Sequence, residues 1–258
     1  MSFIEVCENA ARAGGRELLQ WQGKFTAQEK GPKDLVTEAD LASQRVIRDL
    51  ILGAYPTHRF VGEEDDDTPT PSTAEGYEWI VDPLDGTCNY VHGLPAFAVS
   101  IALTLDSQVI AGVIYDPVAE ECFAAELGQG ATLNGLKIEV SRCQTLGEAL
   151  VASSFPPQVE RDSPEIQRFT DVLIRSQALR RWGSAALNLS YVACGRLDAY
   201  WATSVKKWDV AAGCLLVTEA GGIITRLDGS PFVLEDPKFV ASASSPLHEE
   251  LAQILQSH

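Results

Sequence analysis

Four carboxylates in three separate stretches of this sequence have the chemistry needed to hold a divalent cation. Asp82 and Asp85 lie three residues apart in Asp-Pro-Leu-Asp-Gly-Thr, so both can converge on one point with the Leu84 carbonyl between them. Glu63 lies upstream in Gly-Glu-Glu, and Asp209 lies far downstream in Trp-Asp-Val. Hard cations such as Mg²⁺ prefer oxygen ligands of these types. A metal site is therefore a hypothesis for this chain.

The residues that follow Asp85 can bind an anion beside such a cation. Gly86 and Thr87 supply backbone N–H groups that are free to point outward, as in a small phosphate-binding turn. Structural explanations stay open, because Asp-Pro and Asp-Gly commonly form turns and Asp209 can cap a helix. The acidic run after Gly62 is equally compatible with a solvated loop.

The composition indicates a globular protein with an acidic surface. With 258 residues and 45% hydrophobic content, the chain can bury the core of one large domain or of two lobes. A formal net charge of −16 argues against nucleic acid or an anionic membrane as a partner. A protein this negative repels a phosphate ester, and bound divalent cations are the usual way to reverse the local field.

The cysteines and the distribution of apolar residues favour a cytoplasmic location. Six cysteines stand singly, without the spacing of a zinc site or disulfide framework, and are expected to be small buried side chains in a reducing compartment. Residues 1–20 contain acidic side chains and no continuous apolar stretch, so we expect neither a secretory signal nor a membrane span. The five tryptophans are scattered and are expected in the core.

Helices and strands follow one another in a pattern typical of the α+β class. Helical spacing of apolar residues predicts helices over 3–21 and 37–56, the second opened by a capping box of Thr37 and Asp40. A short buried strand at 79–81 is expected to end at Asp82-Pro83, before an antiparallel meander of runs at 97–105, 109–115 and 121–125. Later helices are expected through 169–174, from 185 past 192, over 210–220 and over 246–255, with short strands at 198–201, 223–224 and 239–242.

Four motifs in order resemble the signatures of the inositol monophosphatase family. The longest are Trp79-Ile-Val-Asp-Pro-Leu-Asp-Gly-Thr-Cys-Asn-Tyr90 and Trp208-Asp-Val-Ala-Ala-Gly-Cys-Leu-Leu-Val-Thr-Glu-Ala-Gly-Gly222, and Gly62-Glu63-Glu64 and Asp34-Leu-Val-Thr-Glu-Ala-Asp40 match two upstream motifs. The resemblance spans nearly the whole chain. It implies a layered α-β-α-β-α sandwich, with an N-terminal α+β lobe (1–145) and a C-terminal α/β lobe (146–258), in a protein that is usually a homodimer.

The same resemblance implies roles for individual residues. One Mg²⁺ is expected on Glu63, Asp82 and the Leu84 carbonyl, a second on Asp82, Asp85 and Asp209, and a weaker third near Glu63. Glu63 and the Thr87 hydroxyl would orient and deprotonate a water for direct, in-line attack on phosphorus, with Asp85 completing the catalytic set. The residues expected around the substrate are Asp85, Gly86, Thr87, Gly183, Ser184, Ala185 and Asp209. The residues expected to support the site are Thr37, Asp40 and Glu64.

The substrate is expected to be a small phosphorylated metabolite. Inositol phosphatases carry a glutamate seven residues before the metal aspartate, where Ala202 stands here. Lys206 and Lys207 could bind a second anionic group of the substrate or could simply be exposed to solvent. The expected activity is Mg²⁺-dependent hydrolysis of a phosphate monoester of a small polyol or sugar. The alternatives are histidinol phosphate, fructose 1,6-bisphosphate or a 3′-phosphoadenosine nucleotide as the substrate, and a catalytically idle regulatory homologue that binds metal or phosphate.

Overall fold

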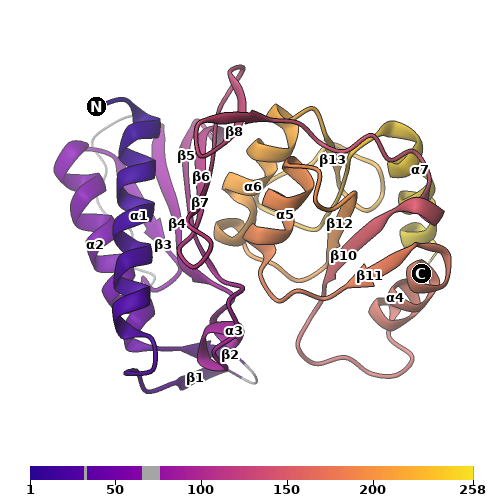
Figure 1. The fold of residues 1–258 in the computed structure, drawn as a ribbon, viewed down its shortest axis with the longest axis horizontal. Helices are drawn as coiled ribbons and strands as arrows, with labels where there is room; N and C mark the ends of the chain where they lie inside the picture. The colour runs from indigo at the N-terminus through magenta and orange to yellow at the C-terminus, as the bar shows by residue number, and fades with distance from the viewer. Residues whose placement is uncertain (32–33, 66–75, 258) are drawn as a thin grey trace.

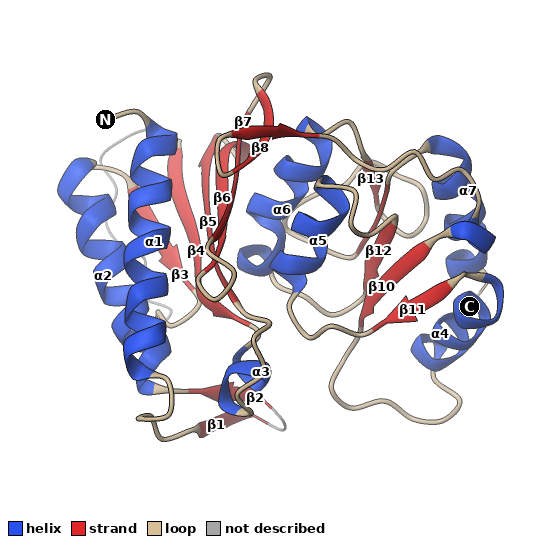
Figure 2. Ribbon diagram, in the orientation of Figure 1, coloured by secondary structure: helices blue, strands red, loops and turns tan. Residues whose placement is uncertain are grey.

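Helices and sheets alternate in layers, which is the layered α+β arrangement that the resemblance implies (Figure 1, Figure 2). The computed structural model describes residues 1–31, 34–65 and 76–257. One outer layer is formed by α1 (Phe3–Trp21) and α2 (Glu38–Ala54), and the other by α4 (Pro164–Arg175) and α7 (Ser245–Gln256). Between the two large sheets lie α5 (Ala185–Ala193) and α6 (Lys207–Glu219).

The first large sheet has seven strands in the order β3-β4-β5-β6-β7-β8-β9. Its strands β3 and β4 are parallel, and each later neighbour is antiparallel. This confirms the predicted meander and extends it by two strands. The strands are β3 (Arg59–Gly62), β4 (Tyr77–Asp85), β5 (Ala98–Leu105), β6 (Gln108–Asp116), β7 (Glu121–Glu126), β8 (Gly130–Leu133) and β9 (Leu136–Ile138).

The second large sheet has five strands in the order β11-β10-β12-β14-β13. Strand β10 runs parallel to β11 and β12, whereas β14 is antiparallel to β12 and β13. The strands are β10 (Leu150–Ser154), β11 (Ala178–Arg180), β12 (Ala199–Ala202), β13 (Ile223–Thr225) and β14 (Phe239–Ser242). The division of the chain into lobes 1–145 and 146–258 stays a prediction.

The shorter elements join these layers. Strands β1 (Gln28–Gly31) and β2 (Asp34–Val36) form an antiparallel hairpin where the sequence predicted no element. Helix α3 (Thr87–Val91) follows β4, and a 3₁₀ turn, η1 (Leu146–Glu148), precedes β10. None of the helices in the described part of the chain is long and apolar enough to cross a bilayer.

Helix α2 begins at the capping box that the sequence predicts. The Thr37 hydroxyl accepts a hydrogen bond from the Ala39 N–H at 3.1 Å, and the Asp40 carboxylate accepts one from the Thr37 N–H at 2.9 Å. The box satisfies backbone donors that the first turn of a helix leaves without partners. It also fixes Asp40 at the end of α2 that faces β4 and α3.

Strand β4 differs from the prediction because it does not end at Asp82-Pro83. It continues to Asp85, with three residue steps on β4 matched by two on β5, where Asp82 pairs with Ser100 and Asp85 pairs with Ala98. Such a bulge accommodates a proline, which has no N–H to donate to the neighbouring strand. The bulge therefore keeps both aspartates on one strand.

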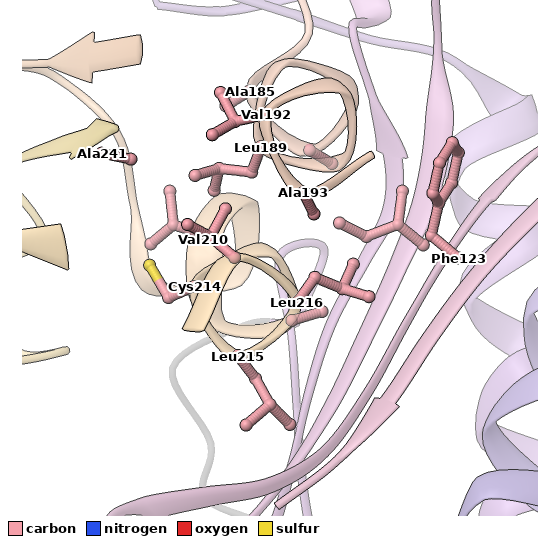
Figure 3. Close-up of a cluster of buried hydrophobic side chains, with 14 of the residues drawn as sticks. Phe123, Ala185, Leu189, Val192, Ala193, Val210, Cys214, Leu215, Leu216 and Ala241 are labelled. Carbon is pink, nitrogen blue, oxygen red and sulfur yellow. The ribbon is translucent and has the colours of Figure 1, made fainter. Parts of the chain in front are cut away.

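Side chains of α5 and α6 form much of the core between the two sheets, among them Leu189, Leu215 and Leu216 (Figure 3). A side chain at Gly112 of β6 would place its Cβ 2.9 Å from the Cα of Ala212 on α6. Both neighbours are therefore small because backbone approaches backbone at this point. Close packing of this kind does not tolerate an added methyl group without movement of the helix.

We expect Gly112→Ala to lower the free energy of unfolding by about 1–3 kcal/mol, the usual cost of overpacking a tight core. Gly53→Ala is the matched control, because a Cβ at Gly53, near the exposed end of α2, would have no described atom outside the neighbouring helix backbone within 4 Å. Alanine there is expected to be neutral or to stabilise by up to about 1 kcal/mol. Urea unfolding of both variants measures the difference, and equal midpoints would contradict the tight contact.

Two expectations about burial are wrong for single residues. Cys7, Cys122 and Cys214 are buried as predicted, but Cys143 and Cys194 are only half-buried, and Cys88 is exposed. Trp182 is 44% exposed, although it was expected in the core. Cys88 and Trp182 both line a pocket, which explains why neither side chain is buried.

Candidate active site

Strand β4 presents Asp82 and Asp85 in the interior of the protein. Their exposed fractions are 1% and 8%. Asp82 accepts a hydrogen bond from the Leu84 N–H at 2.9 Å, which spans the bulge. The predicted pair of carboxylates is therefore placed by a strand with a bulge, not by a turn that leaves the strand.

Helix α6 brings Asp209 to these two carboxylates. The helix begins after Lys206, so Asp209 is its third residue, and the alternative that Asp209 precedes the helix as its N-cap is wrong. The Asp209 carboxylate instead accepts the Lys206 N–H at 2.8 Å. The adjacent Trp208 carbonyl accepts a hydrogen bond from Ser100 at 3.2 Å, and Ser100 pairs with Asp82 across the sheet. These contacts hold the start of α6 against β4 and β5.

The carboxylates affect one another electrostatically. Burial raises the pKa of Asp82 well above its usual value, and repulsion from Glu63, Asp85 and Asp209 raises it further. Burial is also the main reason that the pKa of Asp209 is raised, with Asp85 the next contributor. A concentration of buried negative charge of this kind is common at functional sites and suits a bound cation.

A short loop after β3 holds Glu63 next to β4. The Glu63 N–H donates to the Val81 carbonyl at 3.0 Å, one residue before Asp82. Gln44 of α2 accepts from the Glu64 N–H at 3.0 Å and donates to Asp65 at 2.9 Å. Gln44 and Asp65 therefore help to position this loop, and no motif in the sequence singled them out. Gly62 was the sequence feature that could have pointed to a close contact at this loop. A Cβ at Gly62 would lie 2.2 Å from the Gln44 side chain.

Thr87 lies at the start of α3, where it meets both β4 and α2. Its hydroxyl donates to the Leu84 carbonyl at 3.0 Å and lies 3.5 Å from a carboxylate oxygen of Asp40. Gly86 before it has a φ of +92°, and a Cβ at that position would lie 2.8 Å from the Ala96 carbonyl oxygen. Glycine is therefore required for the tight turn from Asp85 into α3.

The start of α5 holds Asp85 from the opposite side. The Ser184 hydroxyl and the N–H groups of Ala185, at 3.1 Å, and Ala186, at 2.9 Å, all donate to the Asp85 carboxylate. Ser184 also caps the helix by accepting the Leu187 N–H at 3.2 Å. The Gly-Ser-Ala segment that was expected around the substrate is thus, in this structure, a partner of Asp85.

A pocket of about 530 Å³ opens beside these groups. Asp85 and Asp209 line it, as do Phe155, Arg181, Trp182, Gly183 and Ala185. The remaining described residues of the lining are Cys88, Asn89, Ser154, Pro157, Ser204 and Val205. The pocket has room for a phosphate group together with a small alcohol portion.

The carboxylates suit a hard cation chemically, but they do not surround one point as they lie. In the part of the chain that the structure describes, no three His, Cys, Asp or Glu side chains are close enough together to hold a metal ion. Asp85 and Asp209 take hydrogen bonds from backbone N–H groups instead. The repulsion that raises the pKa of Asp82 is what a divalent cation relieves. The donor set therefore fits such an ion, and ligation by these residues stays a prediction.

Ala202 and Lys207, which the sequence singled out for substrate choice, both lie outside the lining of this pocket. Ala202 is fully buried on β12 and is not among the residues that line the pocket. Lys207 donates to Glu78 at 3.2 Å and lines a separate cavity of about 420 Å³. The interpretation of Lys207 as a substrate-binding cation is therefore wrong, because α6 turns its side chain toward the start of β4.

Comparison with known proteins gives consistent matches over the full chain. The model of the family described as "Inositol monophosphatase family" matches residues 2–258. A Nus factor SuhB from Pseudomonas aeruginosa is 37% identical, over 99% of this chain and 96% of the relative. An inositol-1-monophosphatase from Rhizobium meliloti is 36% identical, over 99% of this chain and 96% of the relative.

Solved structures agree with the sequence matches. The extragenic suppressor protein suhB from Bartonella henselae superposes with a TM-score of 0.93 at 35% identity, covering 98% of this chain and 97% of its own. An IMPase/NADP phosphatase complexed with Mg²⁺ and phosphate has a TM-score of 0.83 at 27% identity, covering 95% of this chain and 91% of its own.

Proposed function

We propose a substrate class and a set of residue roles for this chain, which belongs to the inositol monophosphatase family. It is accordingly a phosphoric monoester hydrolase, and its activity depends on magnesium. The proposal is that it hydrolyses the phosphate monoester of a small polyol or sugar, of the type that inositol monophosphate represents. Two to three Mg²⁺ ions per site would be held by Glu63, Asp82, Asp85, Asp209 and the Leu84 carbonyl.

One observation carries the proposal. Burial raises the pKa of Asp82 and Asp85 on β4 and of Asp209 on α6, and repulsion from Asp85 further raises the pKa of Asp82 and of Asp209, beside an open pocket. Such an arrangement is costly for a protein that only needs to fold, because buried like charges repel. It is useful to a protein that binds cations against a phosphate ester.

The side chains of this protein would divide the work around the reacting phosphate. The Thr87 hydroxyl, which lies between the Leu84 carbonyl and Asp40, would orient the attacking water. Glu63, fixed by its backbone bond to β4, would accept a proton from that water. Magnesium ions held by these carboxylates would neutralise phosphate charge, lower the pKa of water and stabilise the leaving alkoxide. The Ser184–Asp85 contact would keep Asp85 oriented for its role.

The remaining parts of the proposal concern the protein as a whole. It would act on a free phosphorylated metabolite in the cytoplasm, and it would form a homodimer. Support for the first point comes from the net charge of −16, which disfavours polyanionic partners. Support for the dimer comes from the family alone.

A phosphate-release assay tests the proposed reaction. We expect release of inorganic phosphate from inositol 1-phosphate with millimolar Mg²⁺ and none without it. Histidinol phosphate, fructose 1,6-bisphosphate and adenosine 3′,5′-bisphosphate in the same assay rank the alternatives. No Mg²⁺-dependent release from any of the four would contradict the proposal and would favour an idle homologue.

A further inference from the structure

One wall of the active-site pocket carries a cation that the reaction described above does not use. Arg181 is exposed and lies directly before the Trp182-Gly183 turn. Its guanidinium stacks over the Phe155 ring, 4.4 Å from the ring centre, and one nitrogen donates to the Phe155 carbonyl at 3.2 Å. A stacked guanidinium is held in a defined plane, and that bond uses one of its five N–H donors.

The other charged residues of the pocket indicate what the Arg181 guanidinium could bind. Among the described lining residues, the charged side chains are Asp85, Asp209 and Arg181. The two aspartates belong to the proposed cation site, and no ion pair joins Arg181 to any carboxylate in the described ranges. An unpaired guanidinium at the mouth of a pocket is suited to a carboxylate or phosphate of a ligand, which it can bind through two parallel hydrogen bonds.

The lysine pair does not compete for this role. Lys207 is engaged with Glu78 and faces another cavity, and Lys206 does not line the active-site pocket. A second anionic group of a substrate, for which these lysines were one candidate partner, would therefore need a different one. Arg181 is the residue of the pocket lining that can meet it.

Aromatic and aliphatic side chains lie beside Arg181 in the pocket lining. Trp182 is 44% exposed, and its indole packs edge-on against Tyr191 at 6.4 Å between ring centres. Phe155 and Val205 line the same pocket. Aromatic faces favour a ring of the substrate, and no further carboxylate in the described lining offers a partner to an ammonium group.

We propose that Arg181 is a specificity-determining residue, and that the preferred substrates are phosphate monoesters whose leaving alcohol carries a second anionic group. Trp182 provides the surface for the ring that bears this group. The inference rests on the proposed hydrolysis and narrows its substrate class. It also predicts that amines such as histidinol phosphate are poor substrates.

Matched substrate pairs test the inference. Fructose 1,6-bisphosphate is compared with fructose 1-phosphate, and adenosine 3′,5′-bisphosphate with adenosine 3′-phosphate, all with Mg²⁺. We expect Arg181→Ala to lower kcat/KM about tenfold or more for the doubly charged member of the preferred pair, because a charge-assisted bidentate contact is lost. The loss should appear as a higher KM, and kcat/KM for the singly charged member should change less than twofold.

Arg180→Ala is the matched control, because Arg180 is exposed, carries the same charge and does not line the pocket. It should leave both members of each pair unchanged, and Arg181→Lys should retain part of the preference. An equal loss on both members with Arg181→Ala, or the same loss with Arg180→Ala, would overturn the proposal. If Arg181→Ala is unstable, a folded Arg181→Lys variant replaces it in the test: partial loss of the preference supports the proposal, and an unchanged preference would overturn it. Failure of every substrate with the unmodified enzyme would instead refute the proposed function.

Discussion

Asp85→Asn is expected to lower kcat by at least about 100-fold while the protein stays folded. Loss of an outer partner of a metal ligand typically costs 10- to 100-fold, and Asp85 is proposed as a ligand itself. The fold should tolerate the change because the amide has nearly the same shape. Burial already raises the pKa of Asp85, so its charge opposes folding in the absence of a cation. Steady-state kinetics and thermal unfolding measure the two effects.

Asp116→Asn is the control for this experiment. Asp116 is a buried carboxylate of β6 that accepts two backbone hydrogen bonds, from Val118 and Ala119, both at 2.9 Å. It is a comparable isosteric change away from the proposed site, and kcat should stay within about twofold. A near-normal rate for Asp85→Asn, or an equal loss for both variants, would exclude the proposed role of Asp85.

Removal of divalent cations is expected to abolish phosphate release and to lower Tm. The carboxylates Asp82, Asp85 and Asp209 repel one another in the buried site, and a bound cation relieves that repulsion only in the folded protein. Ligand binding to the native state alone contributes about 2.7 kcal/mol when the free ion is at 100 times its Kd. A Mg²⁺ titration of the chelator-treated protein, followed by Tm and by activity, measures this coupling.

Asp85→Asn and Asp116→Asn distinguish binding of magnesium at the proposed site from nonspecific effects of magnesium on stability. Asp116→Asn should show the full rise in Tm with Mg²⁺, and Asp85→Asn should show a smaller one. Activity that survives exhaustive chelation would contradict metal dependence of this chain. An equal rise in Tm for both variants would place the stabilising ion elsewhere in the protein.

Local signals in the sequence were sufficient for several elements. The capping box at Thr37 and Asp40 and the apolar spacing of α1 predicted helices that the structure contains. Turn residues between β-prone runs predicted the meander of β5, β6 and β7. These signals depend on a few neighbouring residues, so they can be recognised without knowledge of the rest of the fold.

Strand β4 and helix α6 show where local signals failed. Pro83 suggested that the strand ends, but the ladder with β5 continues past it through a bulge. Asp209 was a candidate for the helix cap, but the helix begins two residues before it, at Lys207, and Asp209 lies inside its first turn. In both cases the contacts with a distant element outweighed the local preference.

The sequence by itself determined the kind of chemistry. It contains four carboxylates in motifs that resemble those of the family, a glycine turn after Asp85 and a net charge that disfavours polyanionic partners. The tertiary structure alone decided how these residues are used. Packing between the two sheets joined Ser184 to Asp85, turned Lys207 away to Glu78 and left Arg181 and Trp182 at the pocket. Residue type and spacing are fixed by covalent connection, whereas the direction of a side chain and its partners depend on contacts between segments far apart in the chain.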